Sequence, residues 1–356
     1  MKEVYIYPGS FCPPTLGHLH IIKKASEIFP EISIVCSSDS EKENIFSEDE
    51  CKTLWRTYNL PQNVAVKTFS EIKREGHNYS RIILIRGIRN DADFENERKV
   101  AMLNRKMFGI SKYLYFFSDP DFTNVSSSLV RKLAQDMELE KLHLYLSPLS
   151  ISALLERTLN VNNIFMVVGK AGSGKSTFLK MLNEVNAQNI HVNTDDFSEE
   201  LKPLVEKMFP GKNLVDLALN DEEKLLSIIA MPWIDLLKNR LKNVSKHSNI
   251  FIEIPYGMQS NKQMYRFVGG KIIYIGCKDE RINRLRVCER GTPDLLPFVD
   301  RIPGWEETYK IAKQNNLSLQ RIDASRSLEE LRGEVEKLNA LLEKGGKETW
   351  KTFLQK

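Results

Sequence analysis

The sequence predicts an α/β protein built from two doubly wound parallel-sheet domains, and three observations support this fold class. The chain has 356 residues, which at roughly 150 residues per domain is enough for two domains with separate cores. Short apolar segments alternate with segments whose apolar residues recur at helical spacing, as in a parallel sheet covered by helices. This alternation stops in a polar stretch at residues 160–163 and begins again at Ile164. We therefore expect domains over residues 1–158 and 164–332, followed by a charged helical C-terminal tail over residues 333–356.

The elements of the first domain follow from this alternation. Consecutive apolar residues predict strands at residues 4–7, 32–36, 64–69, 82–85 and 113–117. Pro8 and Gly9 are expected to end the first strand. Helices are expected from residue 17, from residue 47, over residues 95–107 and from residue 126. The helix from Ser47 is the clearest of these, because Glu50 completes a capping box with it.

The second domain is expected to repeat the fold class with a different motif. It begins with a strand at residues 164–168, a glycine-rich turn and a helix. Further strands are expected at residues 190–192, 250–254 and 271–275. Because the glycine-rich turn has no counterpart in the first half, we expect the two domains to do different things.

The charge balance excludes a protein that coats nucleic acid. The chain has 51 Lys and Arg against 47 Asp and Glu, a formal net charge of +4. Residues 1–160 hold 21 side chains of each sign, so the whole excess lies in residues 161–356, which hold 30 basic and 26 acidic side chains. This balance leaves room for local anion sites but not for a broad basic groove.

The cysteines and the hydropathy pattern indicate in which cellular compartment the protein is expected. Five cysteines without a C-x-x-C pair argue against a zinc ribbon or a disulfide framework and fit a reducing environment. The sequence has neither a run of about 18 apolar residues nor the layout of a signal peptide. We therefore expect a cytoplasmic protein with small-molecule substrates that binds neither nucleic acid nor membrane.

The turn after the first predicted strand has the residues of a phosphate site. Gly9, Ser10 and Phe11 follow the strand, and Gly17 and His18 open the next helix. In a doubly wound sheet, ligands bind at the carboxyl ends of the strands. Free backbone N–H groups and the helix dipole favour phosphate there. His18 is expected to face the same space.

Two further segments are expected at the same edge of the sheet. Arg86 and Arg89 follow an apolar strand, and guanidinium groups in that position would clamp phosphoryl oxygens. Ser126, Ser127 and Ser128 open a helix, which is another amino end suited to an anion. Either segment alone also fits an ordinary surface turn, but together with the first turn they predict one nucleotide site.

These motifs resemble the nucleotidyltransferase superfamily, and most closely phosphopantetheine adenylyltransferase, over nearly all of residues 1–158. The resemblance includes residues 9–11, the Gly17-His18 pair, Lys42, residues 86–94, residues 104–105 and residues 126–128. It implies a Rossmann-like domain that transfers an adenylyl group from ATP to 4'-phosphopantetheine, giving dephospho-CoA and pyrophosphate. An assembly of identical chains through the first domain is left open.

The resemblance also implies residue roles. The phosphopantetheine end would be held by Ser10, Lys42 and Arg86. ATP would be held by Ser10, Phe11, His18, Gly87, Arg89, Glu97, Ser126, Ser127 and Ser128. The catalytic residues, which would act by position and charge without a covalent intermediate, would be His18, Lys42 and Arg89. Cys12 stands where this family has Asp, and we expect the replacement to affect the rate more than the binding.

The glycine-rich turn of the second domain matches the P-loop pattern G-x-x-x-x-G-K-[ST] at residues 169–176. It follows an apolar strand and opens a helix, which is the context that the motif requires. Backbone N–H groups would wrap the β-phosphate, Lys175 would bridge the β- and γ-phosphates, and the Ser176 hydroxyl would bind Mg²⁺. The ATP-binding residues expected here are Gly169, Ala171, Gly172, Ser173, Gly174, Lys175, Ser176 and Thr177.

A strand-end carboxylate pair and a basic helix complete this second site. Asp195 and Asp196 follow the strand predicted at residues 190–192. A carboxylate there can take a hydroxyl proton or orient Mg²⁺, and the alternative is a cap for the next helix. The arginines expected to close over ATP as a lid are Arg284, Arg286 and Arg290. The alternative for them is an exposed basic helix.

The second domain resembles small-metabolite kinases, and most of all dephospho-CoA kinase, over about residues 164–330. By that resemblance Lys175 and Asp196 are catalytic, with Asp196 as the base, and Lys170 replaces a glycine of the family. The two resemblances together predict a bifunctional enzyme of coenzyme A biosynthesis that makes dephospho-CoA and then phosphorylates its 3'-hydroxyl. Residues 195–197 are also similar to uridine and nicotinamide riboside kinases. A nucleoside or vitamin acceptor therefore stays open, as does a non-catalytic ATP-sensing module.

Overall fold

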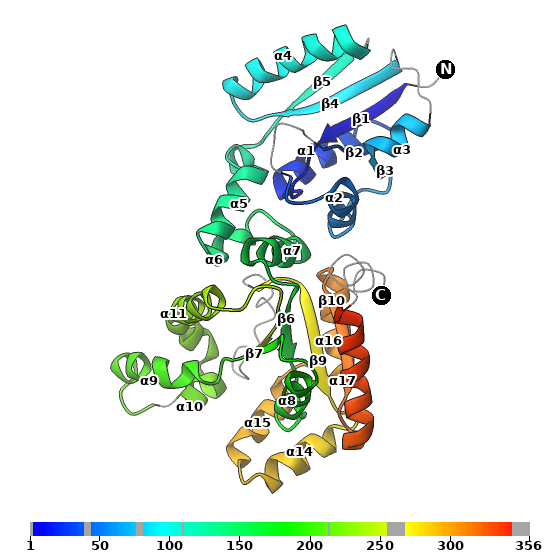
Figure 1. Ribbon diagram of the computed structural model, residues 1–356. Helices are drawn as coiled ribbons and strands as arrows, with labels where there is room; N and C mark the ends of the chain where they lie inside the picture. Colours follow the sequence, from blue (N-terminus) through cyan, green and yellow to red (C-terminus); the bar gives the residue numbers. More distant parts are fainter. Residues whose placement is uncertain are drawn as a thin grey trace. The chain divides into compact units, whose positions relative to one another are not determined.

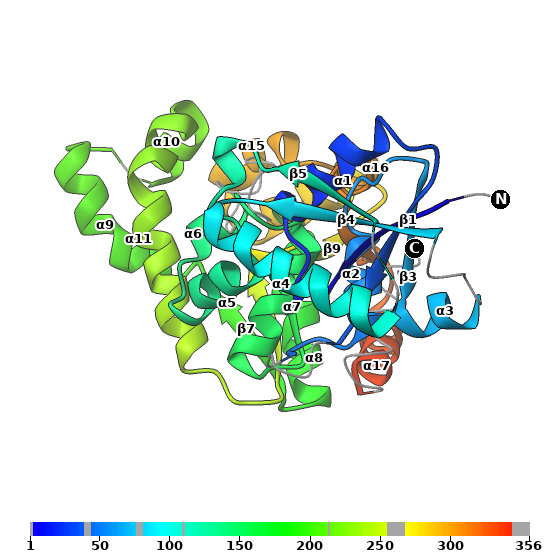
Figure 2. The ribbon, with the colours of Figure 1, turned by 90° about the horizontal axis from the view of Figure 1, so that it is seen from above.

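The computed structural model confirms the predicted fold class, with two five-stranded parallel sheets and flanking helices (Figure 1, Figure 2). It describes residues 3–38, 44–75, 81–108, 110, 112–212, 214–254 and 268–343. The chain divides into two compact units, one formed by Met1–Asp136 with Lys141–Ser150 and the other by Met137–Glu140 with Ile151–Lys356. The division falls before most of the helix that precedes the polar stretch at residues 160–163.

The first unit contains a sheet with the strand order β3-β2-β1-β4-β5. Its strands are β1 (Val4–Gly9), β2 (Ile32–Cys36), β3 (Val64–Thr68), β4 (Ile82–Ile88) and β5 (Lys112–Phe117). Its helices are α1 (Leu16–Ser26), α2 (Glu48–Trp55), α3 (Phe69–Arg74), α4 (Asp91–Phe108), the 3-10 turn η2 (Pro120–Phe122) and α5 (Ser127–Gln135). Because β2 and β3 lie on one side of β1 and β4 and β5 on the other, the sheet has a switch point between β1 and β4, where ligands of such folds bind.

Strands β1 and β4 are both longer than the sequence indicated. β1 continues through Pro8 and Gly9, which pair with the end of β2. Its pairing with β4 stops at Ile6, so Pro8 has a neighbouring strand on one side only, a position at which a sheet tolerates proline. β4 continues to Ile88, so Arg86 lies within the strand and not after it. The glycine and the arginine of the candidate site are thereby fixed to the sheet itself.

The amino end of α1 is fixed by a capping box that uses a candidate site residue. The Thr15 side chain accepts the backbone N–H of His18, and the His18 ring accepts the backbone N–H of Thr15. A buried cluster of this unit contains Ile6, Val35, Ile72, Ile82, Leu84 and Ile110. All five residues of β2 are buried, as expected for an inner strand of a parallel sheet.

The second unit contains a sheet with the strand order β10-β9-β6-β8-β7. Its strands are β6 (Asn163–Val168), β7 (Asn189–Asn193), β8 (Asn249–Glu253), β9 (Lys271–Gly276) and β10 (Ser318–Asp323). Helices α6 (Leu139–Leu142) and α7 (Pro148–Leu159) lie where the chain divides. The other helices are α8 (Lys175–Val185), α9 (Phe197–Met208), α10 (Leu214–Asn220), α11 (Glu222–Lys242), α14 (Glu280–Glu289), η3 (Pro293–Leu295), α15 (Leu296–Arg301), α16 (Trp305–Gln314) and α17 (Leu328–Glu343).

Helices α8 and α17 lie side by side and cover one face of this sheet (Figure 1). Their apolar side chains form one buried cluster with residues of β6, β8, β9 and β10. Residue 332, where we expected the second domain to end, lies inside α17, and Val335 and Leu342 beyond it belong to the cluster. Residues 344–356 of the expected tail lie outside the described residues.

A row of polar side chains crosses the second sheet at the amino ends of its strands. Asn189, Asn249, Asn163 and Lys271 are the first residues of β7, β8, β6 and β9, and each is at most 3% exposed. Asn249 donates to Asn189 at 2.9 Å, Asn163 to Asn249 at 2.8 Å and Lys271 to Asn163 at 3.0 Å. Lys271 also forms an ion pair with Glu156 of α7 at 2.8 Å. These bonds link four neighbouring strands in a fixed order.

Candidate functional site

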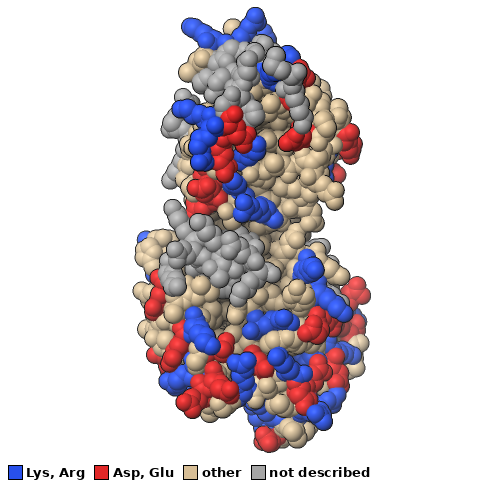
Figure 3. Space-filling view, turned by 90° about the vertical axis from the view of Figure 1, so that its right-hand side faces the viewer, with Lys and Arg blue, Asp and Glu red and all other residues tan. Residues whose placement is uncertain are grey.

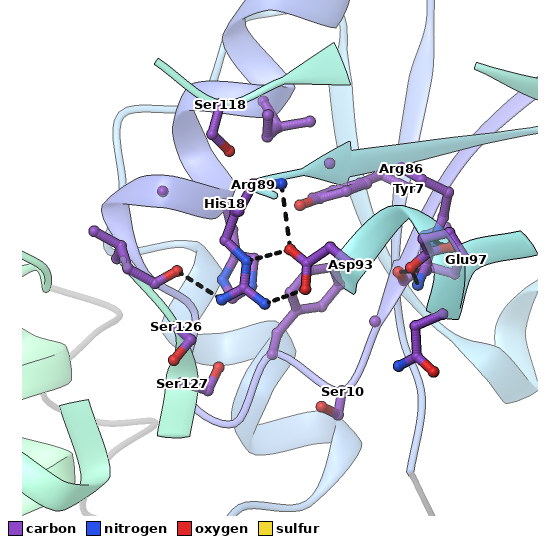
Figure 4. Close-up of a pocket in the computed structure, with 18 of the residues that line it drawn as sticks. Tyr7, Ser10, His18, Arg86, Arg89, Asp93, Glu97, Ser118, Ser126 and Ser127 are labelled. Atoms are coloured by element: carbon purple, nitrogen blue, oxygen red, sulfur yellow. Dashed lines mark hydrogen bonds and ion pairs between the residues drawn. The ribbon is translucent and has the colours of Figure 1, made fainter. Parts of the chain in front are cut away.

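A pocket of about 640 Å³ opens at the carboxyl ends of β1 and β4 in the first unit (Figure 4). Its walls come from the turn after β1, from β4, from α4 and from the start of α5. The predicted site residues that line it are Ser10, Phe11, His18, Arg86, Gly87, Arg89, Glu97, Ser126, Ser127 and Ser128. Lys42 lies outside the described residues. Sequence reasoning gave no site role to Tyr7, Asn96 or Ser118, which also line the pocket, because no pattern marks them.

His18 is a neutral hydrogen-bond donor in this pocket. Its Nδ1 accepts the backbone N–H of Thr15 at 3.1 Å and lies 3.0 Å from Thr15 Oγ1. The proton of the neutral ring therefore sits on Nε2. Burial, together with the positive charges of Arg89 and Arg86, lowers the pKa of His18 to about 3. At neutral pH the ring can donate a hydrogen bond to a phosphoryl oxygen without carrying a charge of its own.

Phe11 forms a wall of the pocket beside His18. Its backbone has a φ of 46°, an uncommon conformation for a residue with a large side chain. The ring packs edge-on against His18, with the ring centres 5.1 Å apart, and against Trp55 of α2, with the centres 5.2 Å apart. A Cβ atom at Gly9 would lie 2.8 Å from the Phe11 ring, so this arrangement depends on glycine two residues earlier.

Both arginines are held by carboxylates of α4. Arg86 donates to the two oxygens of Glu97 at 2.7 and 2.5 Å and to the carbonyl of Pro8 at 2.9 Å. Arg89 donates to the two oxygens of Asp93 at 2.6 and 2.9 Å. Burial works against the charge of Arg86, but the bonds to Glu97 raise its pKa. Glu97, which we assigned to ATP, therefore contacts the arginine that we assigned to phosphopantetheine.

The three serines join the start of α5 to the first turn. The Ser126 hydroxyl caps α5, the Ser127 hydroxyl donates to the Pro13 carbonyl at 2.8 Å, and the Ser128 hydroxyl accepts from Arg131 at 3.3 Å. All three hydroxyls are thus engaged. A bound anion would meet the backbone N–H groups and the dipole of the first turn of α5.

In the second unit, the loop between β6 and α8 forms a cradle of backbone. Gly169, Gly172 and Gly174 have φ values of 155°, 70° and 88°. A Cβ atom would lie 2.0 Å from a carbonyl oxygen of β9 at Gly169 and 2.5 Å from one of α14 at Gly172, so both positions require glycine. Ser173 Oγ is buried and has no hydrogen-bond partner among the described residues. An orphaned buried hydroxyl in a glycine-rich loop fits a site that receives an anion.

Lys175 connects this loop to a carboxylate at the end of β8. Its Nζ donates to the carbonyls of Gly169 and Lys170 at 2.9 and 3.3 Å and lies 4.0 Å from Glu253. Glu253 is only 4% exposed and also bonds His191 Nε2 at 3.1 Å. Burial works against its charge, but His191 and Lys175 lower the pKa of Glu253. We did not single out Glu253 from the sequence, although an acidic residue that ends an apolar strand was the available signal.

The two neighbouring aspartates after β7 have different surroundings. Partial burial and the negative charge of Glu253 raise the pKa of Asp195, while Lys175 acts in the opposite direction. Asp196 precedes α9 and accepts a hydrogen bond from Asn193 at 3.2 Å. Asp195 is thus influenced electrostatically by Lys175 and Glu253, and Asp196, our predicted base, lies at the start of a helix.

The predicted lid arginines lie on α14 and at its end. Arg286 donates to the Ala324 carbonyl at 2.9 Å, and its guanidinium would lie 3.8 Å from a Cβ at Gly174. Arg284 pairs with an aspartate of α15, and Arg290 follows the last residue of α14. The structure therefore brings Arg286 to the glycine-rich loop.

Lys170 joins the same loop to two helices. Its Nζ contacts Glu280 of α14 and the Val299 carbonyl of α15, both at 2.7 Å, and the residue is 3% exposed. The lysine that replaces a glycine of the resembled kinase family therefore fastens the loop to the segment that carries the arginines.

Comparison with known proteins shows the family of the first domain. Residues 6–133 match the cytidylyltransferase-like family. The phosphopantetheine adenylyltransferase of Bdellovibrio bacteriovorus is 34% identical over 136 residues, which cover 38% of this chain and 85% of that protein. The corresponding enzyme of Syntrophomonas wolfei is 37% identical over 137 residues, which cover 37% of this chain and 83% of that protein.

The first domain belongs to the phosphopantetheine adenylyltransferase family. The cytidylyltransferase-like match ends before β6, so any chemistry of the second unit rests on the geometry of its own loop and carboxylates. No helix in the described part of the chain is long and apolar enough to cross a membrane.

Two solved structures align with larger parts of the chain. TT1252 from Thermus thermophilus covers 50% of this chain and 96% of that chain, with 20% identity and a TM-score of 0.38. NadR protein in complex with NR covers 90% of this chain and 98% of that chain, with 13% identity and a TM-score of 0.32. Both TM-scores are too low to establish a common fold.

Proposed function

We propose that the protein catalyses two successive reactions, adenylyl transfer from ATP to 4'-phosphopantetheine in the first unit and phosphorylation of the dephospho-CoA 3'-hydroxyl in the second. The first reaction is supported by the family of the domain. The observation that carries it is the neutral His18 beside two arginines at the switch point of the sheet. The second reaction is supported by the glycine-rich loop with Lys175 and two strand-end carboxylates.

In the first reaction a phosphate oxygen of phosphopantetheine attacks the α-phosphorus of ATP. A new P–O bond forms, and the bond to the leaving pyrophosphate breaks. His18 donates its Nε2 hydrogen to an oxygen of the α-phosphate, where negative charge builds up. Arg86 and Arg89 hold phosphoryl oxygens of the two substrates in line. The attacking phosphate is already ionised at neutral pH, so this step requires no general base.

In the second reaction the 3'-hydroxyl oxygen attacks the γ-phosphorus of ATP, a new P–O bond forms, and the bond to the leaving ADP breaks. Lys175 holds the β- and γ-phosphates, and a carboxylate takes the proton of the attacking hydroxyl. We assign this role of base to the carboxylate of Asp195. The surroundings push the pKa values of the two carboxylates apart, since that of Asp195 is raised and that of Glu253 is lowered. Such a separation distinguishes a base from a permanently charged group.

Mg²⁺ fits the second site only together with ATP. Within the described residues, no group of three or more His, Cys, Asp or Glu side chains is arranged to hold a metal ion. Mg²⁺ prefers few protein ligands and several phosphate or water oxygens. The Ser176 hydroxyl at the start of α8 and the Glu253 carboxylate are the oxygen donors that this chain would offer. Bound there, the ion would neutralise charge on the β- and γ-phosphates.

A kinase with another small acceptor, such as a nucleoside or a vitamin, is the second candidate for the second unit. A module that only senses ATP would need the loop and Lys175 but no base. The carboxylates of Asp195 and Glu253, which interact electrostatically with Lys175 of the loop, favour a catalytic role over sensing.

Mass spectrometry of one reaction mixture tests the proposal. The protein is incubated with 4'-phosphopantetheine, ATP and Mg²⁺, and pyrophosphate is followed in parallel. Formation of CoA supports both reactions, and dephospho-CoA without CoA supports the first reaction and leaves another acceptor for the second unit. Absence of pyrophosphate and of both products would overturn the assignment of the first reaction. Dephospho-CoA supplied directly then tests the second unit by itself.

A further inference from the structure

A histidine of the second unit lies beside the carboxylate of Glu253 and has no part in the proposed reaction. His191 lies on β7, and Glu253 is the last residue of β8. The two strands are parallel neighbours, and Glu253 pairs with Asn193, two residues after His191. Because side chains two residues apart on a strand point to the same face, His191 and Glu253 lie diagonally on one face of the sheet.

The Glu253 carboxylate is held between this histidine and the lysine of the glycine-rich loop. Its Oε2 lies 3.1 Å from His191 Nε2, and its Oε1 lies 4.0 Å from Lys175 Nζ. The Glu253 side chain is 6% exposed, whereas the His191 side chain is 25% exposed. An ionised carboxylate only accepts hydrogen bonds, so Nε2 of His191 carries the hydrogen and donates it to Oε2.

The main chain of Glu253 is fixed by the same neighbouring segment. The buried Thr194 hydroxyl donates to the carbonyl of Glu253. With its main chain held in the sheet and bonded by Thr194, Glu253 can move only through rotation of its side chain. The bond from His191 therefore fixes the direction in which the carboxylate points.

The distance from Glu253 to Lys175 matters for the binding of ATP. Lys175 directs N–H groups to the loop carbonyls of Gly169 and Lys170. A distance of 4.0 Å is longer than a hydrogen bond, so Glu253 attracts Lys175 without bonding it directly. In a buried site a direct contact between two opposite charges is much stronger, and the phosphates of ATP would have to displace it. A carboxylate kept at this distance competes less with phosphate for Lys175.

We propose that His191 is a positioning residue for ATP binding in the second unit, because its bond to Glu253 keeps the carboxylate from closing onto Lys175. This inference rests on the ATP site of the proposed function but not on the identity of the acceptor. Without the bond, the charge of Lys175 draws the carboxylate toward it, and ATP then competes with a direct ion pair. Loss of His191 should therefore weaken ATP binding, and additional loss of the Glu253 charge should restore it.

The test measures ATP affinity by isothermal titration calorimetry without Mg²⁺, so that a metal-binding role of Glu253 does not enter. Lys175→Ala identifies the part of the titration that belongs to the second unit. We expect His191→Asn to weaken this binding about tenfold, the effect of losing one hydrogen bond to a charged group, because its shorter amide cannot reach Glu253. His191→Gln places its amide nitrogen near the position of Nε2 and should bind ATP about as well as the wild-type protein.

The double variant His191→Asn with Glu253→Gln separates positioning from a structural effect. It lacks both the histidine and the negative charge, so it should bind ATP within about twofold of Glu253→Gln alone. Damage to the fold by His191→Asn would persist in the double variant. His247→Asn is the matched control and should keep the wild-type affinity, since His247 is exposed and precedes β8, at the other end of the strand from Glu253.

The outcomes distinguish this inference from the proposed reaction. If His191→Asn binds ATP as well as the wild-type protein, or if the double variant is as weak as His191→Asn, the inference is wrong. If the wild-type protein shows no ATP binding that depends on Lys175, the inference and the proposed ATP site both fail. If binding behaves as expected but dephospho-CoA is not phosphorylated, the proposed reaction fails and the role of His191 stands.

Discussion

The charge state of a single histidine decides how the first site can work. In water a histidine is partly protonated near neutral pH, but burial and two neighbouring arginines lower the pKa of His18 to about 3. A third positive charge would add to the two that already attract phosphate, at a cost in a buried site. The neutral ring instead contributes one directed N–H, and the capping box with Thr15 fixes its orientation.

Replacing His18 tests this role at the level of one hydrogen bond. We expect His18→Ala to lower kcat for pyrophosphate release by about 10²- to 10³-fold, the usual loss for one donor to a transition-state oxygen. The KM for ATP should change much less. His20→Ala is a matched control on the same helix, because His20 faces Asp119 and does not line the pocket. Equal losses in the two variants would show that the effect comes from α1 and not from the Nε2 hydrogen.

The adjacent Asp195 and Asp196 offer a comparable test in the second unit. Asp195→Asn should lower phosphoryl transfer by about 10²- to 10⁴-fold, the range for loss of a general base, with ATP affinity almost unchanged. Asp196→Asn should cost far less, since that side chain bonds Asn193 at the start of α9. Single-turnover kinetics with dephospho-CoA and ATP measure both variants. A larger loss in Asp196→Asn would contradict the role of Asp195 and support Asp196 as the base.

At the level of secondary-structure elements, a buried ion pair between Lys271 and Glu156 stabilises the amino ends of the strands in the second sheet. It lies at the edge of the row of polar side chains. The Lys271 side chain is fully buried, burial lowers its pKa, and Glu156 opposes that effect. Such a pair is stabilising only while both partners are present, because either charge alone would be left in a medium of low polarity. The same row explains why polar residues begin otherwise apolar strands.

We expect Glu156→Gln to destabilise the second unit by about 3–5 kcal/mol, the range for breaking a buried pair by removing one partner. The double variant Glu156→Leu with Lys271→Met should recover most of this loss, since it removes both charges. Urea unfolding measures the change, followed by tryptophan fluorescence in a Trp55→Phe background, which removes the buried tryptophan of the first unit and leaves the buried Trp233 of this unit as a reporter. A double variant as unstable as the single one would mean that the ion pair itself is required.

The elements that the sequence predicted are those with strong apolar patterns. Strands β1 and β6 are the middle strands of their sheets, and both begin close to their predicted positions. The capped helices α1 and α2 also begin close to the predicted residues. Strand β10 was missed because it is an edge strand with the half-polar sequence Ser318–Asp323, whose burial alternates weakly. The ends of β1 and β4 were placed too early, because only the pairing with β2 and β5 shows that Gly9 and Arg86 continue their strands.

The same limit applies to the candidate sites. Local patterns pointed to the glycines, His18 and the arginines, since turns and helix starts are encoded over a few residues. Glu253 and the contrast between Asp195 and Asp196 depend on distant parts of the chain that meet only in the folded sheet. The hydrogen bond from the Phe46 amide to the Cys12 sulfur likewise joins positions more than 30 residues apart.

On the scale of the whole molecule, each unit has its own sheet, buried cluster and strand-end site. The surface in Figure 3 shows basic and acidic side chains of the second unit interspersed, without a single-sign face on that side. The excess of positive charge in residues 161–356 is therefore not gathered into a basic surface there. The residues at the two sites differ as well, because the first holds a buried neutral histidine beside two arginines and the second holds a glycine-rich loop beside carboxylates.

Separate sites predict that two chains, each defective in one site, complement one another. His18→Ala should fail to make dephospho-CoA but should phosphorylate it when it is supplied, and Asp195→Asn should stop at dephospho-CoA. Mixed in equal amounts with phosphopantetheine and ATP, the two variants should form CoA at about half the wild-type rate per total protein, because each unit is an independent fold with its own core. Liquid chromatography with mass detection follows both products over time. If each variant keeps its own half-reaction but the mixture accumulates dephospho-CoA without CoA, the intermediate is transferred only within one chain, and the two units act as a coupled pair.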